Sequence, residues 1–401
     1  MNLKNCPKLK CGKAETPENT VAYLHNAISA IHNYTYLEQK VADHLYWSAM
    51  FIDDLDFRAM GKGISPIMCR AGALAEGAEW LTSREAQTLP GYTTAHQDDL
   101  GNVLGIEELL SHIGTLTASD LKRIKNSDCA QYWADGYSLI NGRTIKVPIE
   151  YVRRISGPSG LAAGNAREEA IEHALCEIFE RRAHITTLRY RLTMPTIDVN
   201  SIQNDIVQEQ LDFIRSKNIE VYLKDLSFGG ELPCVGAYFK DRNIPENFQF
   251  HHFFKVGSAF DREEALIRCF TEYVQGRKLD EFIKGQKEEQ TRVLKDDFRA
   301  LQCMPDDGDN FLSSFMFGMV PYADAEFMQQ GEVVAFDKGI RYNDFLDDIN
   351  KALEILKRLA KDCIVVDFTD PEIGFPVIQV IVPGYSDVLP YYPSNSTVLF
   401  K

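Results

Sequence analysis

The sequence lacks the features on which membrane, secreted and nucleic-acid-binding proteins depend. No apolar signal core follows the first residues, and the uncharged stretch between Glu18 and Glu38 holds three Asn and two His, so it predicts no membrane span. The nine Cys are an odd number without a Cys-x-x-Cys pair, which favours free thiols in a reducing cytosol. The formal net charge of −15 disfavours binding to nucleic acids or to an anionic membrane. We therefore expect a cytoplasmic protein with neither kind of partner.

What is present is typical of a globular chain. Hydrophobic residues make up 45% and charged residues 25% of the 401 residues, enough for a large core without disulfides. This length predicts two or three domains, or one large one. Helical and extended patterns alternate along the chain, so we predict a mixed α/β, or α+β, fold.

Helices are predicted where a capping residue precedes an apolar face. They begin at Thr16-Pro17, at Ser65-Pro66 (ending near Thr82), at Asn165 with Glu168 as a capping box, at Asp261 with Glu264, and over 343–361. The first has a predicted buried face of Val21, Leu24, Ile28, Ile31 and Leu37. Residues 145–155, 219–225, 233–239, 363–368 and 376–382 are expected to be extended, and residues 83–130 are polar and turn-rich.

An acidic motif repeats three times in the chain. The copies are Glu76 with Glu79, Glu177 with Glu180, and Glu272 with Gln275. Each first Glu follows a small residue by thirteen positions, and these residues are Gly63, Gly164 and Ala259. One Glu-x-x-Glu is usually a solvated helix face, but surface charge has no reason to repeat at a fixed offset from glycine.

Helical spacing places each motif on a stripe, because residues three and four apart share one face. The stripes are Gly72, Glu76 and Glu79; Asn165, Glu169, His173, Glu177 and Glu180; and Arg268, Glu272 and Gln275. Gly72 leaves room for a close approach to its helix. Three acidic faces favour a shared site for Mg²⁺ and phosphate without a P-loop, in which Lys62, Arg181 and Arg268 balance the charge.

Other metal sites are less favoured. A di-iron carboxylate site needs Glu-x-x-His, but Glu180 and His184 are four apart. Cys6 and Cys11 have no His nearby to complete a zinc site. Cys69, Cys176 and Cys269 are expected to be buried thiols in the three helices.

The combination of these segments resembles the YcaO family. The most specific stretch is Ser159-Gly160-Leu161-Ala162-Ala163-Gly164-Asn165, followed by Glu168-Glu169-Ala170 and Glu177-Ile178-Phe179-Glu180-Arg181. Other segments agree in order: Gly12-Lys13 with Thr20, Gly61-Lys62-Gly63 with Glu76 and Glu79, Arg268 with Thr271-Glu272 and Gln275-Gly276-Arg277, and Gly374-Phe375-Pro376 before Val382-Pro383-Gly384. The resemblance runs from about residue 12 to residue 386.

YcaO proteins are ATP-dependent enzymes that activate backbone amides. The resemblance implies a YcaO-like fold with three pseudo-repeated glycine-turn and acidic-helix units around one nucleotide site, with ATP and Mg²⁺ as cofactors. It implies that residues 1–60 form an N-terminal helix and strands contributing to that site, that 61–386 form the catalytic core, and that 387–401 form a tail.

The resemblance also assigns residues to roles. It implies nucleotide contacts by Lys13, Thr20, Gly72, Glu76, Asn165, Glu169, Arg181, Arg268 and Gln275. It implies Mg²⁺ ligands among Glu76, Glu79, Glu169, Glu177 and Glu180. It places Glu177, Glu180 and Arg268 at the reaction itself.

The nucleophile decides the product in this family: a Cys, Ser or Thr side chain gives an azoline, and external sulfide gives a thioamide. Many members have Asn where this chain has Ser159, and azoline-forming members commonly end in a Pro-x-Pro-x-Pro tail that Pro390–Lys401 does not contain. We therefore expect thioamidation of a peptide or protein, most simply at glycine.

The resemblance further implies a homodimer and a separate TfuA-like or sulfur-delivery partner. Two alternatives stay open, namely an azoline-forming cyclodehydratase and a non-catalytic, nucleotide-binding accessory factor for ribosomal-protein methylthiolation.

Overall fold

The computed structural model describes residues 1–52, 55, 57–84, 91–112, 116–125, 130–246, 251–276, 318–320, 322 and 324–387. The chain divides into two compact units. The first unit comprises 1–32, 75–181 and 342–401, and the second comprises 33–74 and 182–341. The residues of α2 (Pro66–Arg84) and α6 (Arg167–Arg189) are shared between the units. The boundaries predicted at 60 and 386 stay predictions.

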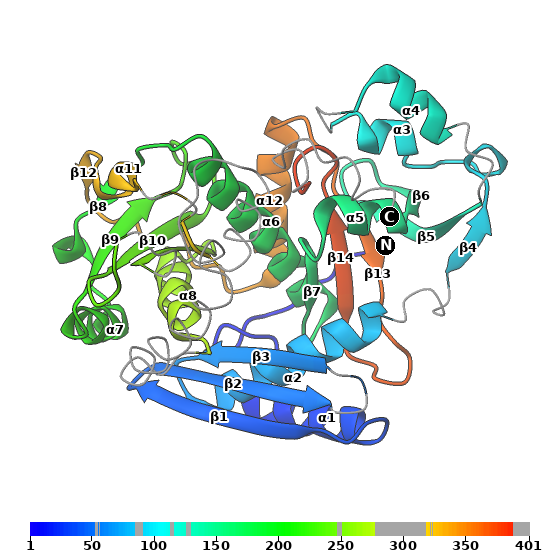
Figure 1. Cartoon of the computed structure of the whole chain (residues 1–401). Helices are drawn as coiled ribbons and strands as arrows, with labels where there is room; N and C mark the ends of the chain where they lie inside the picture. Colours follow the sequence, from blue (N-terminus) through cyan, green and yellow to red (C-terminus); the bar gives the residue numbers. More distant parts are fainter. Residues whose placement is uncertain are drawn as a thin grey trace, which may run out of the picture. The chain divides into compact units, whose positions relative to one another are not determined.

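The first unit is built on an antiparallel six-stranded sheet (Figure 1). Its strand order is β4-β5-β13-β14-β7, and β6 pairs with β5. The strands are β4 (Tyr92–Ala95), β5 (Gln131–Ser138), β6 (Arg143–Pro148), β7 (Leu161–Ala163), β13 (Ile364–Asp367) and β14 (Val377–Ile381). β7, the strand that leads into α6, therefore lies at one edge of this sheet.

Two helices of the first unit begin at polar capping residues. Thr16 caps α1 by accepting the Asn19 N–H, and Asp344 caps α12 by accepting the Leu346 N–H. The helices here are α1 (Pro17–Ser29), α3 (Ile106–Leu110), α4 (Ala118–Lys125), α5 (Ile149–Ser156) and α12 (Phe345–Arg358), with a 3₁₀ turn at Gln97–Asp99.

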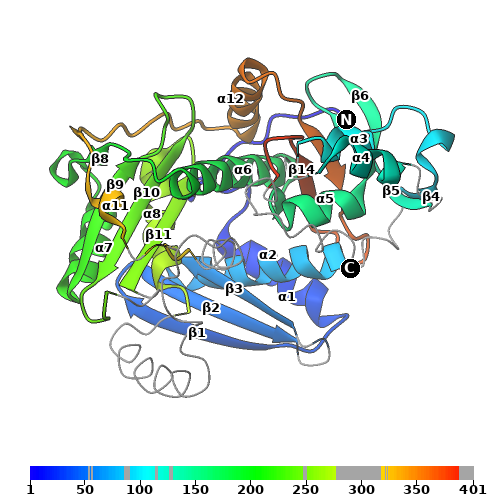
Figure 2. The same cartoon turned by 45° about the horizontal axis from the view of Figure 1, so that its top comes forward.

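The described residues of the second unit form two sheets. One has the antiparallel order β1-β2-β3 (Figure 2), and the other has the order β11-β10-β9-β8-β12. The strands are β1 (Thr35–Ala42), β2 (Leu45–Ile52), β3 (Phe57–Gly63), β8 (Thr196–Ile197), β9 (Ile219–Asp225), β10 (Cys234–Asp241), β11 (His252–Ser258) and β12 (Val333–Val334). The helices are α7 (Asp205–Ser216), α8 (Arg262–Val274) and α11 (Glu326–Gln329), with a 3₁₀ turn at Val199–Ser201.

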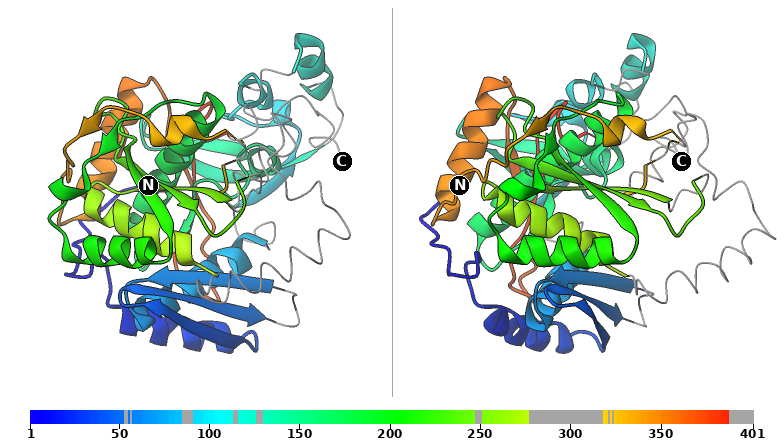
Figure 3. Two further views of the ribbon diagram at one scale, coloured as in Figure 1. Left: turned by 60° about the vertical axis from the view of Figure 1, so that its left-hand side comes forward. Right: turned by 90° about the vertical axis from the view of Figure 1, so that its left-hand side faces the viewer.

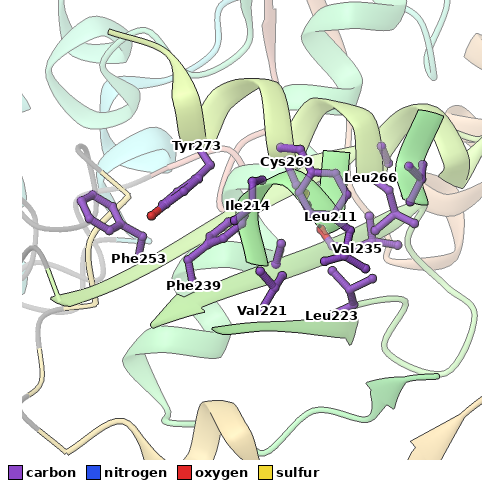
Figure 4. Close-up of a cluster of buried hydrophobic side chains, with 14 of the residues drawn as sticks. Leu211, Ile214, Val221, Leu223, Val235, Phe239, Phe253, Leu266, Cys269 and Tyr273 are labelled. Atoms are coloured by element: carbon purple, nitrogen blue, oxygen red, sulfur yellow. Dashed lines mark hydrogen bonds between the residues drawn. The ribbon is translucent and has the colours of Figure 1, made fainter. Parts of the chain in front are cut away.

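Helix α8 organises the core of the second unit. It contacts β10 and β11 as well as β2 and β3, and with α7 it covers one face of the larger sheet (Figure 3). Leu266, Cys269 and Tyr273 of α8 point toward the strand side chains, and the Tyr273 and Phe239 rings stack at 3.8 Å (Figure 4). Burial of these large apolar side chains is the main stabilising contribution here.

Most of the predicted elements are confirmed. Helices begin at Pro17, Pro66 and Arg262, the helix over 343–361 is α12, and the four later extended segments are β9, β10, β13 and β14. The interleaved helices and sheets are those of the predicted mixed α/β fold.

Two predictions about secondary structure are wrong, and a third stretch has more structure than its composition indicated. Residues 145–155 are extended only to Pro148, because Ile149, Val152 and Ile155 recur at helical spacing and are all buried in α5. Helix α1 ends at Ser29, so Ile31 and Leu37 are 41% and 46% exposed instead of buried. The stretch 83–130 contains β4, α3 and α4. The predicted tail, apart from Asp387, and the charged stretch 283–310 lie outside the described residues.

Candidate functional site

Two glycines flank β7, one directly before it and one in the connection to α6, and they shape the centre of the candidate site. Gly160 has φ +79°, and a Cβ there would lie 2.3 Å from the Val380 carbonyl oxygen. A Cβ at Gly164 would lie 2.6 Å from the Ala170 nitrogen. Only glycine fits these two positions, which explains the glycine-rich segment that the sequence shows before the helix.

Two predicted carboxylates lie against this segment. The Gly160 N–H donates to Glu177 Oε2 at 3.0 Å, and the Ala163 N–H donates to Glu79 Oε2 at 3.0 Å. Burial raises the pKa of Glu79 well above its ordinary value, and the charges of Glu177 and Glu76 raise it further. The structure thus brings Glu76, Glu79 and Glu177 close enough together to repel one another.

This repulsion fits the binding of a divalent cation. A buried carboxylate that resists ionisation among like charges is stabilised in its charged form by a metal ion with hard oxygen ligands. Within the described part of the chain, no three His, Cys, Asp or Glu side chains are grouped tightly enough to hold a metal as they stand. Glu180 lies one turn after Glu177 on α6 and is half-buried. The five metal ligands therefore stay predictions.

The start of α6 gathers a second set of predicted residues. Glu169 Oε2 accepts the N–H and the Nδ2 group of Asn165, both at 3.1 Å, and the Ala14 N–H at 3.3 Å. Thr20 Oγ1 lies 2.7 Å from Asn165 Oδ1, and Lys13 Nζ lies 3.8 Å from Glu169 Oε1. Lys13, Thr20, Asn165 and Glu169, predicted to contact one nucleotide, are therefore neighbours.

The capping pattern at this helix differs from the prediction. Glu169 bonds the Asn165 N–H, whereas Glu168 accepts the Lys4 N–H at 2.9 Å. The helix begins at Arg167, two residues after Asn165, so the acceptor is one residue further along than a capping box requires. Glu168 instead holds the N-terminal segment.

Sequence reasoning placed His173 on the acidic stripe but gave it no role. Its Nε2 lies 2.7 Å from Lys13 Nζ. The periodicity of α6 was the only signal for it, because Lys13 is 160 residues away in the sequence. Arg181 also lies on α6, and its Nη2 pairs with Glu177 Oε1 at 3.4 Å.

The remaining predicted residues belong to the second unit. Arg268 Nη2 donates to Glu264 Oε1 at 2.9 Å, and Gln275 is the residue directly after α8. Gly72 faces the backbone of β3, because a Cβ there would lie 3.5 Å from Gly61 Cα. The close approach that Gly72 permits is thus made by the protein's own strand. Nucleotide contacts by Arg268, Gln275 and Gly72 stay predictions.

The third copy of the acidic motif differs in its partners. Glu272 pairs with Lys62 at 2.8 Å and with Lys255 at 3.5 Å. Its carboxylate is therefore neutralised by two lysines, whereas Glu79 has carboxylate neighbours. Each motif helix directly follows a strand, namely β3, β7 or β11. That the three units surround one nucleotide stays a prediction.

Two smaller predictions concern Ser159 and the thiols. The Ser159 hydroxyl is buried without a hydrogen-bond partner among the described residues, and its carbonyl accepts the Gln379 Nε2 group at 2.7 Å. The buried thiols Cys69, Cys176 and Cys269 are confirmed. Arg277 lies outside the described residues.

Comparison with protein families decides the identity of this fold. A family model described as "YcaO cyclodehydratase, ATP- and Mg²⁺-binding" matches residues 60–386. The chain belongs to the YcaO family. This membership confirms ATP and Mg²⁺ as the predicted cofactors and places the chain among enzymes that activate amides with ATP.

Three curated relatives are similar to this YcaO protein. An uncharacterised Methanothermobacter thermautotrophicus protein is 27% identical over 81% of this chain and 80% of its own length. The Escherichia coli ribosomal protein S12 methylthiotransferase accessory factor YcaO is 23% identical over 62% of this chain and 40% of its own. An uncharacterised Rhizobium leguminosarum protein from the tfuA 3′ region is 28% identical over 36% of this chain and 38% of its own.

Solved structures show the same fold. A heterocyclase in complex with substrate and cofactor has a TM-score of 0.72 at 20% identity, covering 96% of this chain and 54% of that one. YcaO from Methanopyrus kandleri, bound with AMPPCP and Mg²⁺, has a TM-score of 0.61 at 17% identity, covering 93% and 92%. The chain thus spans about half of the heterocyclase and 40% of the E. coli relative. No helix among its described residues is long and apolar enough to cross a membrane.

Proposed function

We propose that this YcaO protein uses ATP and Mg²⁺ to replace the oxygen of a peptide or protein backbone amide with sulfur. The observation that carries its amide-activating part is the pair of carboxylates, Glu79 and Glu177, held against the N–H groups of the glycine-rich segment. Phosphoryl transfer needs positioned cations more than a protein nucleophile, and carboxylates arranged in this way would supply them by holding Mg²⁺.

Each predicted residue has a role in this proposal. Bound ATP supplies the phosphoryl group that converts the amide oxygen into a leaving group. Glu76, Glu79 and Glu177, with Glu169 and Glu180, would hold Mg²⁺. Lys13, Arg181 and Arg268 would stabilise negative charge on the phosphates, and Thr20, Asn165 and Gln275 would orient the nucleotide, with Gly72 lining the site.

The incoming nucleophile in the proposal is sulfide. The carbon–sulfur bond forms at the amide carbon, the carbon–oxygen bond breaks, and the oxygen leaves with the phosphoryl group of ATP as phosphate. The relative from a tfuA region supports this choice, because a TfuA-like protein is the sulfur-delivery or substrate-binding partner that the family resemblance implies. We also propose that the protein works as a homodimer in the cytoplasm.

Mass spectrometry tests the product. Cells that express the wild-type protein are compared with cells that express Glu177→Gln, and their peptides are searched for backbone mass changes. A gain equal to the exchange of oxygen for sulfur, absent with Glu177→Gln, is the expected result. Glu18→Gln, at an exposed position on α1, is the matched control and should retain the modification.

Azoline formation is the second candidate, and the description of the matching family favours it. It consumes a Cys, Ser or Thr side chain and removes one water, so the same experiment shows a loss of mass at such a residue. Finding only this loss would replace thioamidation by cyclodehydration.

An accessory role is the third candidate, and the name of the E. coli relative favours it. An accessory protein would bind Mg²⁺–ATP without modifying a peptide alone. Purified protein that modifies any peptide with ATP in the absence of another enzyme contradicts the accessory role.

A further inference from the structure

His173 connects Lys13 with the glycine-rich segment. Its Nε2 lies 2.7 Å from Lys13 Nζ, and its Nδ1 lies 3.4 Å from the Ala163 carbonyl oxygen. Ala163 also donates its N–H to the Glu79 carboxylate at 3.0 Å. One imidazole thus bridges the predicted phosphate-binding lysine and the segment that faces the predicted metal ligands.

The chemistry of the two partners determines the tautomer of His173. An ammonium group can only donate hydrogen bonds, and a carbonyl oxygen can only accept them. Nε2 therefore accepts from Lys13, and Nδ1 carries the proton that points to Ala163. The imidazole is neutral in this arrangement.

A neutral acceptor differs from a carboxylate in what it leaves to the lysine. Glu169 Oε1 is 3.8 Å from Lys13 Nζ, too far for a hydrogen bond. At this distance Glu169 forms an ion pair with Lys13 but does not fix the direction of its N–H groups. The imidazole adds no charge of its own and accepts from one of the three donors of the ammonium, which orients the group and leaves two donors for phosphate oxygens.

The surroundings of His173 hold its ring in place. The edge of the ring meets Phe345 at a centroid distance of 6.4 Å and an interplanar angle of 90°. Phe345 is 1% exposed at the start of α12, where Asp344 caps the helix and accepts the Cys6 N–H at 2.9 Å. Glu172 Oε2 is 3.8 Å from His173 Nε2.

We propose that His173 is a positioning residue for the nucleotide: it orients Lys13 toward the phosphates and acts only through that lysine. The inference rests on the proposed role of Lys13 in binding ATP. It assigns a function to His173, which the helical spacing placed on the acidic face of α6 but for which the sequence indicated no partner.

The test measures the affinity for Mg²⁺–ATP by titration calorimetry. His173→Leu removes the acceptor, and we expect its Kd to rise about tenfold, the effect of one hydrogen bond to a charged group. His173→Gln can place its amide oxygen near the position of Nε2 and should restore most of the affinity. His173→Asn is too short to reach Lys13 and should resemble His173→Leu, although it is as polar as Gln.

A double-mutant cycle with Lys13→Met shows whether His173 acts through the lysine. We expect His173→Leu to add no further loss in the Lys13→Met background. An equal loss in both backgrounds overturns the proposal, and so does wild-type affinity in His173→Leu. His25→Leu, at an exposed histidine of α1, should change nothing.

The failure of the proposed function gives a different pattern. If wild-type protein does not bind Mg²⁺–ATP, the nucleotide site itself is wrong. If Lys13→Met binds Mg²⁺–ATP as tightly as wild type, Lys13 does not contribute to nucleotide binding. The positioning role of His173 is then wrong as well. Thermal unfolding without nucleotide identifies any variant that fails to fold. If His173→Leu fails to fold, the affinities of His173→Gln and His173→Asn are compared instead.

Discussion

Glu79 is surrounded so that its protonated form is favoured. Burial raises its pKa well above the ordinary range, and the negative charges of Glu177 and Glu76 act in the same direction. Mg²⁺ binds the ionised carboxylate, so we predict that Mg²⁺ binding releases a proton from Glu79 and that Mg²⁺ affinity rises with pH. Calorimetry in buffers of different ionisation enthalpy measures the number of protons released.

Glu79→Gln provides the comparison for this prediction. Proton release should approach one per metal in wild type at a pH below the raised pKa, and it should fall toward zero in the variant. Glu18→Gln should release protons as wild type does. Equal release from wild type and Glu79→Gln would assign the proton to another group.

The same raised pKa predicts how stability without ligand depends on pH. Between the unfolded and folded pKa values of Glu79, the folded state binds more protons than the unfolded state. Stability therefore falls as pH rises from the ordinary carboxylate pKa through the raised one. Denaturant unfolding of wild type should show this fall, and Glu79→Gln should show a smaller one. A slope that is unchanged in the variant contradicts the prediction.

Residue spacing predicted part of the candidate site. The helical stripe predicted that Asn165, Glu169 and His173 share a face. In the structure His173 bonds Lys13, Asn165 bonds Thr20, and Glu169 accepts from Ala14 and Asn165. It could not predict which acid bonds Asn165, because Glu168 and Glu169 differ by one position and the helix start decides between them. It also could not pair His173 with Lys13, since periodicity describes one helix and not the segment packed on it.

At the scale of elements, glycines determine how closely the strands approach the helices that follow them. A Cβ at Gly61 would lie 1.9 Å from the Cys69 carbonyl oxygen and 2.4 Å from the Ala73 nitrogen. These contacts are with backbone atoms, so β3 and α2 would have to separate. We predict that Gly61→Ala destabilises the protein by about 2–4 kcal/mol, measured by denaturant unfolding without nucleotide.

Gly72→Ala is the matched substitution on the facing helix. A Cβ there would have 3.5 Å to its nearest neighbour, an ordinary contact, and alanine is the better helix former. Stability should be unchanged or rise by up to about 1 kcal/mol. If both variants lose the same stability, close packing of β3 on α2 is not the cause.

Asp344 links two elements that are far apart in the sequence. Its Oδ1 accepts the Leu346 N–H at 2.8 Å as the cap of α12 and the Cys6 N–H at 2.9 Å. Asp344→Ala should cost about 1–2 kcal/mol and speed hydrogen exchange at Cys6, because both donors lose their acceptor. Asp344→Asn retains an oxygen there and should recover most of the loss. Faster exchange in both variants alike would show that charge, not the bonded oxygen, matters.

Elements were predicted well where a local chemical signal marks their start. Thr16 with Pro17 and Asp261 are confirmed caps, since capping depends on neighbouring residues alone. Helix α5 was missed because Arg143–Pro148 alternates directly before it and no capping side chain marks the change. The exposure of Ile31 has the same origin, because apolar spacing continued past the true end of α1.

The chain folds into two units that boundaries drawn along the sequence could not predict. The first unit joins three separate stretches of chain, and contacts such as Lys13 with His173 span 160 residues. A prediction based on consecutive segments assigns such stretches to different domains. Family membership predicted the fold as a whole, whereas the composition of each unit required three-dimensional contacts.

This division gives a prediction for nucleotide binding. Four backbone N–H groups that donate to carboxylates lie in two separate stretches of the first unit, at Ala14 and at Gly160, Ala163 and Asn165. If one nucleotide is bound by both stretches, Mg²⁺–ATP should slow hydrogen exchange at both together. The slowing can reach about a hundredfold at a concentration about 100 times Kd. Peptides covering 219–241 serve as the internal reference.

The outcome at α8 decides how much of the molecule the nucleotide engages. One outcome is that Mg²⁺–ATP slows exchange at Arg262–Val274 in addition to the two stretches. If Arg268→Met removes this protection of α8, the result supports the predicted contact between Arg268 and the nucleotide. Protection limited to the first unit would restrict the nucleotide site to Lys13, Thr20, Asn165 and the carboxylates. Protection of one stretch without the other contradicts a single nucleotide site, since a shared ligand must stabilise both segments that hold it.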